Sequence, residues 1–194
     1  REIPREEDWS FLVISSAIAC TDDYTTGTAS ADTQGSVFTL SSDTAIDATF
    51  VGRKIKFATN PNVYEIGTSV IGTTGGLMSP PLSGSTNVRS SAYTIFQSIY
   101  ALPENFDRFP KNGGLLLYEG GRITPIPETA IQNYYRDYLP SPSRPEKCRL
   151  VNVGTDALQR VELSPPPNDA FVLGYEYLQK LDPLYETTAG FVTI

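Results

Sequence analysis

The sequence predicts a mainly β protein, in which a small antiparallel β-barrel or β-sandwich is inserted into a second β-rich unit with one short α-helix. Three observations support this prediction. Short runs of β-branched and aromatic residues show strand-type alternation, turn residues such as glycine, proline and asparagine separate the runs, and one segment alone has the spacing of an amphipathic helix. Helix content is therefore expected to be low.

The first strand is expected in WSFLVISSAI, which begins at Trp9, because alternate residues up to Val13 form an apolar face. Residues 21–36 are small and polar. Four β-type runs follow, at 37–40, 53–57, 63–71 and 93–102, and turn residues separate them. This spacing predicts that residues 20–98 form the inserted barrel or sandwich, while residues 1–19 and 99–194 form the main unit.

The second half of the chain begins with an expected β-hairpin, whose strands 115–118 and 122–123 flank Glu119-Gly120-Gly121. A short helix is predicted at about 127–138, because Pro127 suits a first helical position and apolar residues then recur at helical spacing. Further strands are expected at 149–153, 157–163 and 171–178. The residues spaced for one face of the helix are Ile131, Tyr134, Tyr135 and Tyr138, and those sharing a face of the last strand are Phe171, Leu173, Tyr175 and Tyr177.

The stretch YALPENFDRF, residues 100–109, predicts a strand end followed by a turn. Pro103 has no N–H to continue a ladder, and Asn105 and Asp107 are residues that hydrogen-bond their own backbone in turns. Phe106 and Phe109 are then expected to tuck under the sheet. Arg108 could pair with Glu104 or with a neighbouring subunit, and an exposed pair of this kind contributes about 0–1 kcal/mol.

Composition argues against several classes of function. The chain has 194 residues, a net charge of -7 and no histidine, so it lacks the basic surface typical of nucleic-acid binding and the commonest general base and metal ligand. Its two cysteines, Cys20 and Cys148, lack metal or redox spacing and are expected to be buried and free. No apolar run approaches the roughly 20 residues of a membrane span. No catalytic, metal or cofactor site is predicted.

Three groups of carboxylates are candidates for a catalytic or cation site, and one glycine run is a candidate phosphate loop. Glu104 with Asp107, Asp22 with Asp23, and the segment 6–8 could hold a cation or act on a glycosidic bond, but turn formation explains their polarity. The run GTTGG at 72–76 is not followed by Gly-Lys-Ser or Gly-Lys-Thr, so a hairpin tip is expected there and not a phosphate loop.

The order of motifs resembles virion structural proteins of tailed bacteriophages, of the type that joins head to tail. The residues that carry the resemblance are DWSFL at 8–12, FVGRKIKF at 50–57, VYEIGTSV at 63–70, YTIFQ at 93–97, YALPENFDRF at 100–109, LYEGGRITPI at 118–126 and VELSPPPNDAFVLGYEY at 161–177. Members of this class usually carry helices that dock on the portal, and the N-terminal part of this sequence shows none. Because the sequence starts at Arg1 without methionine and stops after the strand-like FVTI, an excerpt of a longer protein is expected.

The resemblance implies a subunit of a connector or adaptor ring between portal and tail, commonly of about twelve copies, which DNA traverses during genome ejection without specific binding. It also implies location in the virion after assembly in the host bacterial cytoplasm. Aromatic residues and sparse charge suit interfaces between subunits. The candidate interface residues are Tyr100, Pro103, Phe106, Arg108, Phe109, Tyr134 and Tyr138.

Two other functions remain open on the sequence. The first is a binding module of a tail tip, baseplate or fibre, which would recognise a host glycan or protein through the β insert. The second is an enzyme of carboxylate type, such as a glycan hydrolase, for which Glu104 and Asp107 are the best candidates. Binding to glycans would identify the binding module. Loss of activity when Glu104 or Asp107 is changed would identify the enzyme.

Overall fold

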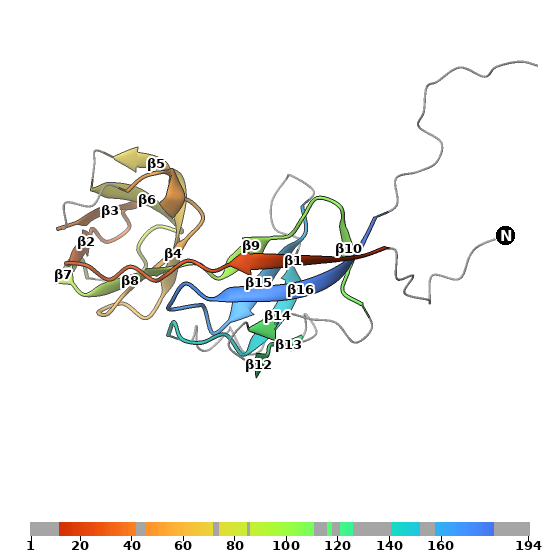
Figure 1. Cartoon of the computed structure of the whole chain (residues 1–194). Coiled ribbons are helices and arrows are strands. Elements are labelled where there is room, and N and C mark those ends of the chain that lie inside the picture. The colour runs from red at the N-terminus through yellow and green to blue at the C-terminus, as the bar shows by residue number, and fades with distance from the viewer. Residues whose placement is uncertain are drawn as a thin grey trace, which may run out of the picture.

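The computed structural model describes residues 12–41, 46–71, 74–84, 86–110, 116–117, 121–125, 141–151 and 158–180. Within them the chain is mainly β and forms three sheets (Figure 1). The predicted fold class is therefore confirmed. One helical element lies wholly within the described residues, the 3-10 turn η2 (Ala48–Phe50). The Asp47 carboxylate caps it by accepting a hydrogen bond from the Thr49 N–H at 2.8 Å.

A seven-stranded sheet curls into a half-barrel, seen at the left of Figure 1. Its two outermost strands, β7 and β8, are consecutive in the chain and are separated by Ala92 alone, so a single segment supplies both edges of the sheet. In spatial order the half-barrel contains β7 (Val88–Ser91), β2 (Ala29–Ala31), β3 (Val37–Leu40), β6 (Gly75–Ser79), β5 (Val63–Ile71), β4 (Lys54–Phe57) and β8 (Tyr93–Phe96).

Alternation along the strands builds the core of the half-barrel. In β3 the side chains of Phe38 and Leu40 are buried and the residues before each are exposed, and in β4 Ile55 and Phe57 are both fully buried. This two-residue period places one face of each strand inside the curl. The apolar interior also includes Ala29, Ala31, Ile46, Phe50, Tyr64, Ile66, Met78, Leu82, Val88, Tyr93 and Ile95.

The other two sheets form the main unit and share one core. Ile123 connects the two sheets, because it stands between a short strand of each. The five-stranded sheet has the order β1 (Val13–Ala19), β16 (Val172–Gln179), β11 (Leu116–Leu117), β12 (Gly121–Arg122), with β10 (Phe106–Arg108) also paired to β16. The four-stranded sheet has the order β13 (Thr124–Pro125), β14 (Lys147–Val151), β15 (Arg160–Ser164), β9 (Ile99–Ala101), with β13 parallel to β14.

Most expected strands are present, with shifted ends. The bounds of β3 and β5 are as predicted, the β11–β12 hairpin pairs Leu116 with Arg122, and Ile71 pairs with Gly75 across the GTTGG tip. In β16, Leu173, Tyr175 and Tyr177 share the buried face as expected. The predicted helix at about 127–138, with Tyr134 and Tyr138, and the start of the first strand at Trp9 lie outside the described residues.

Three strands of the half-barrel were not expected. The polar stretch 21–36 contains β2, whose Ala29 and Ala31 are buried although alanine is a weak strand former. The strands β6 and β7 were also missed, because glycine and serine provide much of their length. Pairing with neighbouring strands overrides weak local propensity here.

We expect Gly76→Ala to destabilise the half-barrel by about 1–3 kcal/mol. Gly76 pairs with Phe38 across β3 and β6, and a Cβ atom at Gly76 would lie 2.8 Å from both Cε1 and Cζ of that buried ring. Urea denaturation would measure the change. Gly67→Ala in β5 is the matched control, because its Cβ would meet the Leu77 Cβ at an ordinary 3.7 Å. Equal unfolding midpoints for the two variants would contradict the prediction.

Candidate functional site

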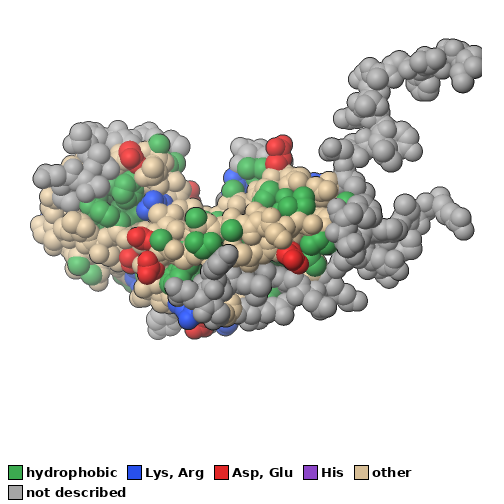
Figure 2. Space-filling view, viewed as in Figure 1, with side chains coloured by type: hydrophobic (Ala, Val, Ile, Leu, Met, Phe, Trp, Pro, Cys, Tyr) green, Lys and Arg blue, Asp and Glu red, His purple; other side chains and the backbone are tan. Residues whose placement is uncertain are grey.

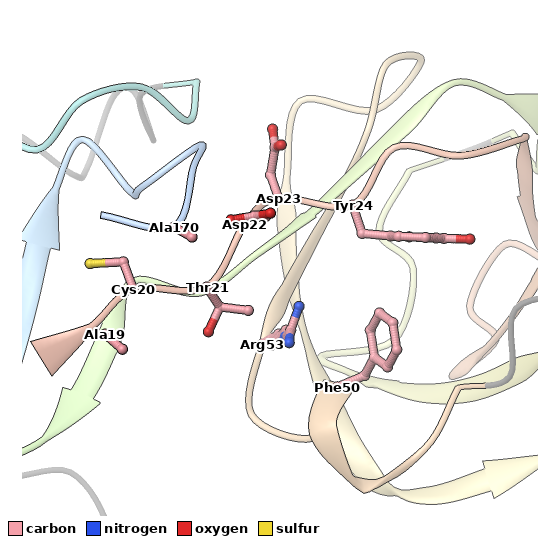
Figure 3. Close-up of a pocket in the computed structure, with 9 residues that line it drawn as sticks. All are labelled: Ala19, Cys20, Thr21, Asp22, Asp23, Tyr24, Phe50, Arg53 and Ala170. Atoms are coloured by element: carbon pink, nitrogen blue, oxygen red, sulfur yellow. The ribbon is translucent and has the colours of Figure 1, made fainter. Parts of the chain in front are cut away.

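An open cleft of about 550 Å³ lies where β1 ends and the chain passes from the main unit to the half-barrel (Figure 3). Hydrogen bonds fix this passage at two points. The Tyr24 N–H donates to the Ile95 carbonyl oxygen at 2.8 Å, and the Thr21 hydroxyl donates to the Gln97 side chain at 3.0 Å. The residues that line the cleft are Ala19, Cys20, Thr21, Asp22, Asp23, Tyr24, Phe50, Arg53 and Ala170.

Arg53 supplies the positive charge of the cleft and is held in place on two sides. Its Nε atom donates to the Thr49 carbonyl oxygen at 2.9 Å, and its guanidinium carbon lies 4.9 Å from the centroid of the Phe50 ring. Burial lowers the pKa of Arg53, and the negative charges of Asp47 and Asp22 oppose that shift. Arginine nevertheless stays protonated in proteins. In Figure 3 the guanidinium points toward Thr21 and Asp22.

Acidic side chains lie on the other side of the cleft. Burial raises the pKa of Asp23, and the nearby carboxylates Asp22 and Asp169 raise it further. Figure 2 shows acidic side chains close to a basic one at the waist between the two units. A search of the described residues finds no group of three or more cysteine, aspartate or glutamate side chains that could hold a metal ion. The cleft therefore combines opposite charges.

The cysteine of the cleft is not an activated nucleophile. Burial raises the pKa of Cys20 from 9.0 to about 11, although a hydrogen bond with the Tyr100 hydroxyl lowers it slightly. Burial also raises the pKa of Tyr100. Both cysteines are buried, as the sequence predicted. Because the thiolate is the reactive form, Cys20 is chemically quiet at neutral pH.

Labelling of Cys20 by Ellman's reagent at pH 8 is expected to be slow in the folded protein and fast in urea, because the raised pKa of about 11 keeps the thiol almost wholly protonated at that pH. A Cys148→Ala background would report Cys20 alone. The raised pKa also favours folding fully below pH 9, and this contribution is lost as the pH rises towards 11. Rapid stoichiometric labelling of the folded protein at pH 8 would contradict the assignment.

A buried ionic triad links the two units beside this cleft. Glu162 in β15 is 3% exposed, and its carboxylate oxygens accept hydrogen bonds from Arg149 Nε at 2.7 Å and from Lys54 Nζ at 3.4 Å. Arg149 lies on the neighbouring strand β14, whereas Lys54 comes from β4 of the half-barrel. The triad thus fixes how the half-barrel sits on the main unit.

The residues that sequence analysis assigned to a subunit interface fall into two groups. Tyr100 and Phe106 are 5% and 0% exposed and belong to the core of the main unit, whereas Pro103, Arg108 and Phe109 are partly exposed. Phe109 packs edge-on against Phe106 with ring centroids 5.1 Å apart. Tyr134 and Tyr138 lie outside the described residues.

Of the carboxylates considered for catalysis, Asp22 and Asp23 line the cleft, whereas Glu104 and Asp107 lie outside it. Both are exposed, Glu104 on the turn after β9 and Asp107 in β10. Asp107 forms an ion pair of 3.4 Å with Arg108, the cation that the sequence offered to Glu104 or to a neighbouring subunit. The acids of segment 6–8 lie outside the described residues.

No helix in the described part of the chain is long and apolar enough to cross a membrane.

Sequence reasoning missed Arg53 and the ionic triad. The sequence carries an ambiguous signal for the triad. Lys54 and Glu162 are charged residues within otherwise apolar strand runs, but strand alternation also expects charged residues where a strand faces solvent. Nothing local identified these two residues as partners across 108 positions.

Comparison of the chain with family models, with curated proteins and with solved structures found no match.

Proposed function

We propose that the protein is a non-enzymatic structural subunit of a bacteriophage head-to-tail connector, which forms a ring between portal and tail and lines the DNA path. The observation that carries the proposal is that the motifs resembling this class coincide with structural elements. FVGRKIKF begins at the last residue of η2 and covers β4, VYEIGTSV covers most of β5, and YTIFQ covers β8. YALPENFDRF covers most of β9 and all of β10, and VELSPPPNDAFVLGYEY covers much of β15 and β16. Their residues build cores and strand ends.

The rigid junction between the units supports the same role. Two chain passages and the triad around Glu162 connect the half-barrel to the main unit. A ring subunit must keep its shape while neighbouring copies press on it, and buried, hydrogen-bonded contacts provide that stiffness. The net charge of -7 is compatible with a channel that repels phosphate and does not retain DNA.

A second candidate is a binding module of a tail tip, baseplate or fibre that recognises a host glycan or protein. The observation in its favour is a polar group on the half-barrel, where exposed Asn62 and Ser83 are joined by a 2.6 Å hydrogen bond and also contact Asn60 or Tyr64. Amide and hydroxyl groups of this kind can bind sugar hydroxyls.

Mass photometry and negative-stain microscopy of the purified protein, alone and with the portal and tail proteins of its phage, would test the proposal. We expect rings of about twelve copies, which corresponds to roughly 250 kDa for a 21.2 kDa chain. A protein that stays monomeric with both partners would contradict the proposal. A specific signal on a glycan array, lost in Asn62→Ala, would favour the second candidate.

A further inference from the structure

Among the strands that the structure describes, β1 pairs on one side only, with β16. Its register places Cys20 opposite Phe171, and the Cys20 N–H donates to the Phe171 carbonyl oxygen at 2.8 Å. Because backbone groups point alternately to the two sides of a strand, Ile14, Ser16 and Ile18 also face β16. The N–H and C=O groups that face the other way belong to Val13, Ser15, Ala17 and Ala19, and within the described residues these groups form no backbone hydrogen bond.

This edge lacks the features by which proteins usually protect such strands. The sequence of β1, VISSAIA, has no charge and no proline, and its seven residue pairs with β16 run without a bulge. The other outermost strands described in the main unit are short, with three residues each in β9 and β10 and two each in β12 and β13. A long, regular and uncharged edge is the usual template for an added strand.

The surroundings of β1 leave room for another strand. The side chains of Ser15, Ala17 and Ala19 are exposed and small. Figure 2 shows a largely uncharged surface where β1 crosses the main unit in Figure 1. Small side chains on one strand accommodate larger ones at directly opposite and diagonal positions of a neighbouring strand.

We propose that this edge of β1 is a docking surface for residues 191–194, Phe-Val-Thr-Ile, of a neighbouring copy. The segment is uncharged and rich in residues that favour strands. Residues 181–190 separate it from Lys180, and an extended run of this length spans at most roughly 33 Å, which is the distance over which the segment can leave its own subunit. The proposal rests on the proposed function, because a ring supplies each copy with such a neighbour.

The same segment of the same chain is a less favourable occupant. The edge of β16 beside β1 is already filled, so the chain leaving β16 would have to cross over β1 to reach its outer edge. A neighbouring copy needs no such crossover. Head-to-tail exchange of one strand per subunit is also the geometry that closes a ring.

A proline at Ala17 tests the edge itself. The Ala17 N–H points away from β16, so Ala17→Pro removes no bond of the sheet but blocks an added strand. We expect the variant to keep its circular dichroism spectrum and to require at least about tenfold higher protein concentration for ring formation. Ala17→Thr, which keeps the N–H, is the matched control and is expected to assemble like the unmodified protein.

Two further variants test the occupant and keep the test decisive if proline disturbs folding. Deletion of residues 191–194 is expected to abolish rings, and a pair of cysteines at Ala17 and Val192 is expected to give disulfide-linked multimers under oxidation. Rings that persist in both Ala17→Pro and the deletion variant, or crosslinks found only within single chains, would overturn this inference alone. A protein that forms no ring before any change would overturn the proposed function as well.

Discussion

Replacing Glu162 with glutamine is expected to lower the free energy of unfolding by about 3 kcal/mol. The carboxylate is 3% exposed and lies between Lys54 and Arg149, whose side chains are 19% and 18% exposed. Removal of its charge leaves two largely buried cations without their shared counterion, and the penalty for unpaired buried charge exceeds the worth of the pair itself. Urea denaturation followed by tryptophan fluorescence or circular dichroism would measure the change.

The control for this experiment is the exposed pair between Arg108 and Asp107. Their atoms are also 3.4 Å apart, as in the Lys54–Glu162 pair, but both side chains are more than 40% exposed. We expect Asp107→Asn to change stability by less than about 1 kcal/mol, because solvent screens exposed charges. If Glu162→Gln proved as mild as Asp107→Asn, the triad would not fix the junction between the two units.

The sequence was informative wherever a strand has one face in a core. The alternation in β16 predicted that Leu173, Tyr175 and Tyr177 share a buried side, and the same reasoning placed β3 and β5 with correct bounds. Two-residue periodicity is a local property that burial imposes directly on sequence. The general fold class followed from these local signals.

Local signals could not reveal contacts between distant segments. β2 is a strand because Ala29 and Ala31 fit between β3 and β7, although neither residue favours a strand by itself. Likewise, nothing near Lys54 shows that its partner is Glu162. Nothing near Arg53 shows that residues 19–24 and Ala170 lie on the other side of a cleft from it. The candidate site is assembled by the fold, so only the candidate acids Asp22 and Asp23 and the cysteine Cys20 were noticed beforehand.

The stretch YALPENFDRF shows both what local sequence signals predict and what they miss. The turn is present, because the Phe106 N–H donates to the Pro103 carbonyl oxygen at 2.9 Å. Of the two phenylalanines expected under the sheet, Phe106 is fully buried, whereas Phe109 packs against the core and stays partly exposed. The role of Asn105 was different from the one expected. Its side chain accepts a hydrogen bond from the Tyr177 hydroxyl at 2.8 Å and so ties the turn to β16.

Phe106→Ala is expected to destabilise the main unit by about 3–5 kcal/mol. The ring is stacked on Tyr177 with centroids 5.6 Å apart and meets Phe109 edge-on, so truncation removes aromatic contacts and leaves a cavity. Thermal and urea unfolding would measure the loss. The size of the effect follows from complete burial, which also means that Phe106 can contribute to a subunit interface only by positioning its exposed neighbours.

Two companion variants separate stability from assembly. Phe106→Leu keeps most of the apolar volume and is expected to cost less than half as much as Phe106→Ala. Phe109→Ala removes a partly exposed ring that packs on Phe106 and Tyr175, so a smaller loss of stability is expected, and a change in ring formation would identify the exposed side of Phe109 as an interface. If Phe106→Ala instead left the unfolding transition unchanged and weakened assembly alone, Phe106 would be an interface residue and its placement in the core would be wrong.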